Sequence, residues 1–145
     1  MKRALNEFEA AAASGRPVRD ATLGSAWLDL AVIEANKLNH LAAIGRLQRA
    51  LGYLTNCPIR SAHEVRLVGQ AQFTLGVLHY EMGAFCHARP YLEQAIATME
   101  QHQGPFGESL LHRWMLLSNV CAKLGDDAAA TAAEARAVAI YDRLP

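Results

Sequence analysis

The apolar and polar positions between residues 68 and 102 repeat with the period of an α-helix. In the first half of this stretch, Leu75, Leu78 and Met82 recur at intervals of three and four residues. The apolar positions of the second half are Tyr91, Leu92, Ala95, Ile96 and Met99. Each half therefore predicts a helix with one apolar stripe. Gly83 directly follows the first stripe, and glycine readily adopts the left-handed conformation that ends many helices. The two helices are therefore predicted to form a hairpin.

Comparable pairs of helical stretches flank this hairpin, and glycine, proline and small polar residues separate them. The elements predicted within a single domain over 1–145 are an N-terminal helix over 1–15 and three helical pairs over 20–58, 61–103 and 108–145. The predicted turns lie at about residues 15–18, 39, 57–60, 83–84, 104–107 and 125–126. The chain is therefore predicted to be all-α, with about seven helices and no strand.

Two local signals bear on where the helices of the central pair begin. Ser61 followed by Glu64 is a capping-box pattern, which predicts a helix start near Ala62. Pro90 is predicted to lie about one turn inside a helix that begins at residues 85–86. A proline there does little damage, because the first four amides of a helix have no partner within the helix.

Several of these positions resemble the signature of the tetratricopeptide repeat (TPR) family. In the central hairpin the matching residues are Leu75-Gly76, the turn glycine Gly83, and Ala88 followed four residues on by Leu92. The corresponding positions of the flanking hairpins hold Trp27, Leu30 and Ala31 in one and Trp114, Leu117 and Ser118 in the other. The resemblance implies a right-handed superhelix of antiparallel helical hairpins, with the first helix of each pair lining the concave side.

The repeat is longer than the family's common unit. Ala31 lies 45 residues before Gly76, and Ser118 lies 42 residues after it, against a standard unit of about 34 residues. The chain thus resembles the long-unit arrays of this family. The additional residues are expected between the repeats, as longer helices or loops.

The resemblance implies a non-enzymatic module that binds a segment of another protein in a concave groove, as an adaptor or chaperone-like protein. The residues predicted to line this groove are Leu28, Val32, Asn36, Phe73, Val77, Tyr80, Met115, Asn119 and Lys123. Because Val32, Phe73 and Val77 are apolar where the family's carboxylate clamp is polar, an apolar or amphipathic segment fits better than a chaperone C-terminus. The alternative is that these side chains belong to the core.

The C-terminal stretch 128–141 is rich in alanine, which lets a second helix approach closely. We predict a homodimer contact through Ala133, Ala137, Ile140 and Tyr141. The alternative is that the alanines act only as good helix formers. Two further functions follow as alternatives to groove binding: a structural self-assembly module, and a regulatory sensor domain of a bacterial regulator.

Composition argues against several other classes of function. Fourteen basic and fourteen acidic residues cancel, so the basic footprint expected of a nucleic-acid-binding protein is missing. No run approaches the roughly 20 apolar residues that cross a bilayer. Glu7 and Glu9 interrupt any signal-peptide core near the start, so the protein is expected in the cytoplasm. The cysteines, Cys57, Cys86 and Cys121, are expected to be reduced.

No residue pattern indicates catalysis or metal binding. His79, Cys86 and His87 form the densest group of metal-ligand residue types, but their spacing matches no zinc motif. Asp126 and Asp127 precede the last predicted helix and are interpreted as its cap rather than as an acid/base pair. We therefore expect no enzyme activity, no cofactor and no metal.

Overall fold

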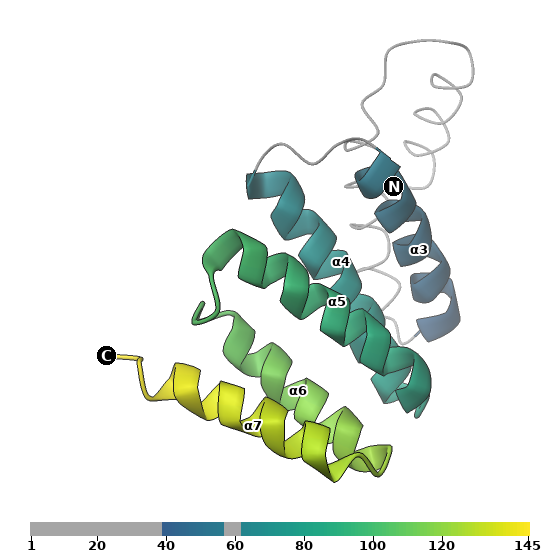
Figure 1. Cartoon of the computed structure of the whole chain (residues 1–145). Helices are drawn as coiled ribbons and strands as arrows, with labels where there is room; N and C mark the ends of the chain where they lie inside the picture. The colour runs from purple at the N-terminus through teal and green to yellow at the C-terminus, as the bar shows by residue number, and fades with distance from the viewer. Residues whose placement is uncertain (1–38, 57–61) are drawn as a thin grey trace, which may run out of the picture. The chain divides into compact units, whose positions relative to one another are not determined.

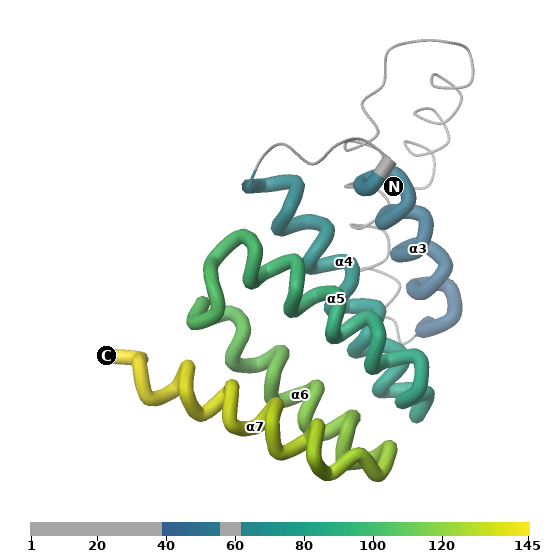
Figure 2. The backbone as a smooth tube through the Cα atoms, viewed as in Figure 1, coloured from purple at the N-terminus to yellow at the C-terminus, as the bar shows by residue number. Residues whose placement is uncertain are grey.

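The computed structural model describes residues 39–56 and 62–145, which are entirely helical apart from turns and short connections (Figures 1 and 2). The helices are α3 (His40–Asn56), α4 (Ala62–Glu81), α5 (Phe85–Gln103), α6 (Leu110–Lys123) and α7 (Asp127–Tyr141). The predicted all-α class is confirmed for this part of the chain, which contains no strand. The helix predicted over 1–15 and the first helix of the pair over 20–58 lie outside the described residues.

Helix boundaries follow the local signals in the sequence. α4 begins at Ala62, as the capping-box pattern predicts. α5 begins at Phe85, and Pro90 lies exposed inside it about one turn from the start. The turns before α5 and α7 each contain a glycine in the left-handed region, with φ of 77° at Gly83 and 81° at Gly125. These connections confirm the two predicted hairpin turns.

The chain divides into two compact units, Met1–Ala71 and Gln72–Pro145, with the boundary inside α4. In the first unit, α3 buries one stripe at intervals of three and four residues. This stripe consists of Ala43, Leu47, Ala50 and Leu54. The spacing keeps all four side chains on one face of the helix, as its periodicity predicts.

In the second unit, the end of α4 and the start of α5 approach closely at Gly76. An added Cβ there would lie 2.7 Å from both Cγ and Cδ2 of Leu92 and 3.4 Å from the Leu92 backbone nitrogen. Leu92 is 0% exposed, so its side chain fills the space that a larger residue at position 76 would need. Thr98 also donates a hydrogen bond from Oγ1 to Oε1 of Gln72, at 2.7 Å.

The core of this unit lies among α5, α6 and α7, which run in alternating directions (Figure 2). Its buried members are Ala88, Leu92, Ile96, Met99, Leu110, Leu117, Val120, Cys121, Ala133 and Ile140. Ser118 of α6 donates a hydrogen bond from Oγ to the carbonyl oxygen of Ala130 in α7, at 2.9 Å. The small residue at each of positions 76 and 118 therefore faces the second helix of its own hairpin.

Three of the four residues predicted to form a dimer contact on α7 are buried. Ala133, Ala137 and Ile140 are buried within the chain itself, whereas Tyr141 is 67% exposed. Alanine is small enough for α6 to pack tightly against α7, so these side chains serve the chain's own core. Of the four predicted contact residues, Tyr141 alone is exposed, and the homodimer stays a prediction.

None of the helices in the described ranges combines the length and apolar character required to cross a lipid bilayer.

Substituting alanine for glycine is expected to have opposite effects at positions 76 and 52. Gly76→Ala forces a Cβ into the buried Leu92 side chain, and overpacking of this kind costs about 1–3 kcal/mol. Gly52 lies in α3 with no atom within 4 Å of an added Cβ, so Gly52→Ala should stabilise by about 0.5–1 kcal/mol through helix propensity. Urea denaturation followed by circular dichroism measures both changes. Equal effects at the two sites would contradict the close approach of α4 and α5.

Candidate functional site

Helices α4 and α6 meet at Phe73, one of the predicted groove residues. Its ring lies edge-on to the ring of His112 on α6, with centroids 5.7 Å apart and an interplanar angle of 69°. The guanidinium carbon Cζ of Arg113 lies over the same ring, 4.6 Å from its centroid. These contacts join α4 and α6 into one surface, which we call the α4–α6 surface.

Along α6 this surface continues through three predicted residues spaced by four. Met115 is 53% exposed, and Asn119 and Lys123 are also exposed. On α4, Val77 and Tyr80 follow Phe73 and are half-buried. The structure therefore shows six of the nine predicted groove residues on two helices that touch, while Leu28, Val32 and Asn36 lie outside the described residues.

Phe73 and Tyr80 also pack partly against the core of the second unit. Tyr80 lies edge-on to Phe85 of α5, with ring centroids 5.5 Å apart. The alternative prediction, that these side chains belong to the core, therefore holds in part for both of them. Removing either ring would affect stability as well as the surface, so Met115 is a cleaner probe of binding.

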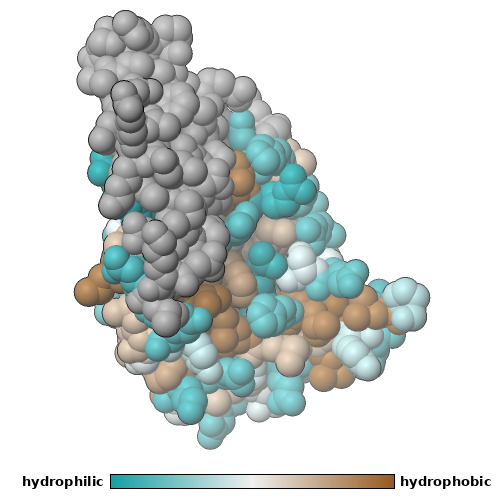
Figure 3. All heavy atoms as spheres, turned by 180° about the vertical axis from the view of Figure 1, so that it is seen from behind, coloured by the Kyte–Doolittle hydropathy of each residue, from teal (hydrophilic) through white to brown (hydrophobic). Residues whose placement is uncertain are grey.

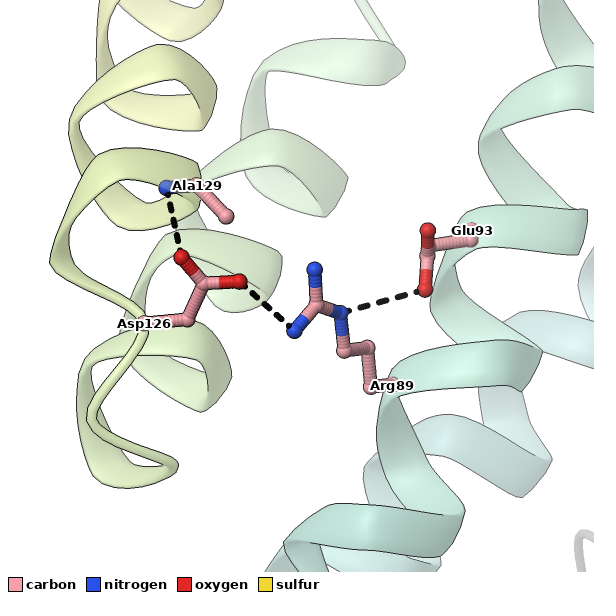
Figure 4. A network of polar contacts seen from close by, with 4 residues as sticks. All are labelled: Arg89, Glu93, Asp126 and Ala129. Atoms are coloured by element: carbon pink, nitrogen blue, oxygen red, sulfur yellow. Dashed lines mark hydrogen bonds and ion pairs between the residues drawn. The ribbon is translucent and has the colours of Figure 1, made fainter.

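Sequence reasoning did not find a polar network that joins α5 to the start of α7 (Figure 4). Arg89 donates from Nη1 to Oδ2 of Asp126 at 3.1 Å, and its Nε lies 3.3 Å from Oε1 of Glu93. Asp126 in turn accepts a hydrogen bond at Oδ1 from the amide of Ala129, at 3.1 Å. This bond, followed by the bond from Arg89, lowers the pKa of the Asp126 carboxyl. The prediction that an aspartate caps this helix is confirmed.

A cavity of about 290 Å³ opens beside this network, between α5, α6 and α7. Its lining residues are Arg89, Glu93, Trp114, Leu117, Cys121, Ala129, Ala132, Ala133 and Arg136. Burial raises the pKa of the Cys121 thiol, which is the opposite of what an activated nucleophile requires. No short sequence pattern could mark this cavity, because its residues come from three helices.

His79, one of the potential metal-ligand residues named above, contacts two other rings. It stacks on Tyr91 of α5 with ring centroids 5.5 Å apart and an interplanar angle of 4°. The ring of His87 is also 5.5 Å away. Burial, and then the charge of His87, lower the pKa of His79. Within the described ranges, no group of three or more potential ligands could hold a metal ion.

Hydrophobic surface on the face shown in Figure 3 gathers over the C-terminal part of the chain and is interrupted by hydrophilic side chains. The exposed large apolar residues of this part are Phe106, Met115, Val138 and Tyr141. They come from α6, α7 and the loop between α5 and α6. An interaction surface in this unit therefore has several separate apolar anchors available.

Comparison with known proteins yields a likeness of fold. No family model matches the chain, and no curated protein matches it. Among solved structures, the crystal structure of BtubC (BKLC) from P. vanneervenii has a TM-score of 0.73 to this chain at 22% sequence identity. The match covers 97% of this chain and 56% of that chain. This chain therefore corresponds to little more than half of that protein, and the likeness concerns the fold alone.

The stacked position of His79 predicts a loss of stability in mildly acidic solution. Because folding lowers its pKa from the ordinary 6.5, the unfolded chain binds more protons near that pH. The free energy of unfolding should therefore fall as the pH drops below about 6.5 and level off below the folded-state pKa. Urea denaturation from pH 7.5 to pH 5 measures this slope.

The His79→Phe variant keeps the stacked ring but cannot titrate, so its slope should be shallower than that of the wild type. His102→Gln, at an exposed position near the end of α5, is the matched control and should retain the wild-type slope. An unchanged slope in His79→Phe would show that other groups control the acid response.

Proposed function

We propose that this chain is a non-enzymatic, tetratricopeptide-like module that binds an apolar or amphipathic segment of another protein on the α4–α6 surface. The contact of Phe73 with His112 carries the proposal, because it joins α4 and α6, the two helices that hold the described groove residues, into one surface. The proposed architecture is seven helices, with an N-terminal helix followed by three hairpins in a right-handed superhelix. The proposed role is that of an adaptor or chaperone-like protein.

Two packing features support the tetratricopeptide-like assignment. Gly76 lets Leu92 approach from the second helix of its hairpin, and Ser118, at the equivalent position, bonds to Ala130 of its own second helix. The same small-residue position thus mediates helix approach in both hairpins. This recurrence is what a repeat built from one supersecondary unit requires.

The chemistry of the exposed side chains supports a protein segment as ligand. A methionine side chain is unbranched and polarizable, so it adapts to apolar partners of different shapes. Met115 exposes half of its surface near the aromatic contact, and Asn119 and Lys123 extend the same side of α6. An apolar anchor bordered by polar groups is the usual composition of a recognition surface.

Met115→Glu should weaken partner capture without unfolding the protein, because it places a charge at an exposed apolar position of the surface. Ala97→Glu, at an exposed position of α5, is the matched control. Each form is used as bait in cell lysate, and quantitative mass spectrometry compares the captured proteins. A partner of the α4–α6 surface should fall by about tenfold or more with Met115→Glu and remain with Ala97→Glu. Equal capture by both variants would contradict the proposal.

A second candidate function, homodimerisation, rests on the exposed side of α7. Val138 is 51% exposed and Tyr141 is 67% exposed, which gives this helix two apolar anchors outside the core. Light scattering should then give about twice the monomer mass of 15.8 kDa. Val138→Glu combined with Tyr141→Glu should restore the monomer. A wild type that stays monomeric at high concentration would exclude this function.

A further inference from the structure

The cavity of about 290 Å³ between α5, α6 and α7 is lined by one stripe of side chains from each helix. The stripe of α6 consists of Trp114, Leu117 and Cys121, at intervals of three and four residues. The stripe of α7 has the same spacing and consists of residues 129, 132, 133 and 136. Residues at these intervals share one side of a helix. The cavity is therefore a regular product of the packing of three helices.

This cavity is separate from the α4–α6 surface. Because an α-helix has about 3.6 residues per turn, Trp114 and Leu117 lie on the side of α6 that is turned away from Asn119 and Lys123. Helix α4, which carries the other half of that surface, contributes no residue to the cavity. A ligand in the cavity would therefore leave the α4–α6 surface open.

The inner wall of the cavity is apolar. Leu117, Cys121 and Ala133 are buried, and six of the nine lining residues carry no charge. An apolar cavity of about 150 Å³ holds benzene, so about twice that volume accommodates a ring with a short side chain. The lining and the volume are those of a site for a small molecule, at the lower end of the usual range of sizes.

The charges that line the cavity leave one cation without an opposite partner. Arg89 is paired with Asp126 at 3.1 Å and with Glu93 at 3.3 Å (Figure 4), so the lining carboxylate of Glu93 already has a cation. Arg136 also lines the cavity, and its Cζ lies 5.6 Å from the centroid of the Trp114 ring. Among the described residues, no ion pair is found for Arg136.

We infer that the cavity binds a small organic carboxylate, with its apolar part against Leu117 and Ala133 and its carboxylate paired with Arg136. Arginine binds carboxylates through short, charge-assisted hydrogen bonds. Because Arg136 lines the cavity and is also exposed, its donors are accessible to a ligand that enters from solvent. The ligand is a free acid, since a cavity of about 290 Å³ is too small for a helical segment of a partner.

Such a ligand contacts α5, α6 and α7 at once. Because the unfolded chain has no cavity, ligand binding stabilises the folded unit in proportion to the logarithm of the ligand concentration. The bonds of Arg89 already connect α5 to the start of α7, so little conformational freedom is left for the ligand to remove. Saturation with the ligand should therefore raise the thermal midpoint of unfolding.

The probe that tests this site is phenylpropionate, which joins a benzene ring to a carboxylate through a short chain. It is titrated into the isotope-labelled whole chain, and binding is followed by two-dimensional NMR. The backbone amide signals of residues 114–121 and 129–136 should shift, whereas those of residues 43–54 in α3 should not. The absence of any shift in the lining residues at about 10 mM probe, ten times a dissociation constant of about 1 mM, would overturn the inference.

Three related molecules separate the contributions of the ring and the charge. Phenylpropanamide keeps the ring without the charge, and acetate keeps the charge without the ring. Each should bind the wild type about tenfold more weakly than phenylpropionate does. Equal binding of the amide would overturn the role of the carboxylate, and equal binding of acetate would reduce the site to an ion contact. Phenylpropylamine reverses the charge, and tighter binding of this amine would assign the site to Glu93 instead.

Two variants with matched controls test the residues. Arg136→Gln should weaken phenylpropionate by about tenfold and leave phenylpropanamide unchanged. Its control is Arg143→Gln, because Arg143 also lies over an aromatic ring, 3.6 Å from the centroid of Phe106, outside the cavity. Ala132→Phe places a ring at an exposed lining position and should abolish binding of both molecules. Its control is Ala135→Phe, at an exposed position of α7 that does not line the cavity.

Unchanged affinity of Arg136→Gln for phenylpropionate would overturn the inference even if the probe binds. The comparison of the four molecules uses the wild-type protein, so it gives a decisive result even if a variant unfolds. None of these measurements involves capture of a partner protein. Failure of the proposed function would therefore leave a carboxylate site in the cavity standing, and absence of this site would leave the proposed function standing.

Discussion

The second unit depends on the close approach of α4 and α5 at Gly76. A hydrogen in place of a side chain lets the Leu92 side chain fit against the α4 backbone, and Leu92 itself is fully buried. Ala88 and Ala95, one turn to either side of Leu92 on α5, are equally buried. Small side chains on α5 thus allow the two helices of the hairpin to pack as densely as a protein interior. In such packing, the loss of even one methylene group lowers the stability of the fold. Every later helix of the unit packs onto this pair directly or through α6.

The position of α7 combines apolar packing with one polar connection. Ala133 and Ile140 are buried in the core that α7 shares with α5 and α6. This apolar burial supplies most of the free energy that stabilises the packing of α7. Asp126 caps the helix and accepts from Arg89, so a single side chain both ends the preceding turn and bonds to α5. Exposed ion pairs contribute little stability, and the value of this network lies in fixing where α7 starts.

The α4–α6 surface follows from the same packing. Phe73 is held partly against the core, and this position presents one side of its ring to His112 and Arg113. Arg113 is therefore desolvated by a side chain whose own place is set by the fold. The proposed binding surface would lose little conformational freedom when a ligand binds, because its aromatic residue is anchored in the core. The packing of Phe73 against the core thus both stabilises the hairpin and places the side chains of the α4–α6 surface.

The sequence by itself determined the helices of the described region and the turns between them, because these depend on neighbouring residues. Gly83 and Gly125 mark turns that need a left-handed backbone, and the apolar periodicity marks which face of α5 is buried. Tertiary structure alone decided which face of α7 is buried. Alanines lie on all sides of α7, so its sequence contains no apolar stripe that distinguishes the buried Ala133 from its exposed neighbours. It also decided the pairing of Arg89 with Asp126, and it left Nε of Arg113 buried without a hydrogen-bond partner. Such contacts join residues that are distant in sequence, and no local pattern specifies the distance between two helices.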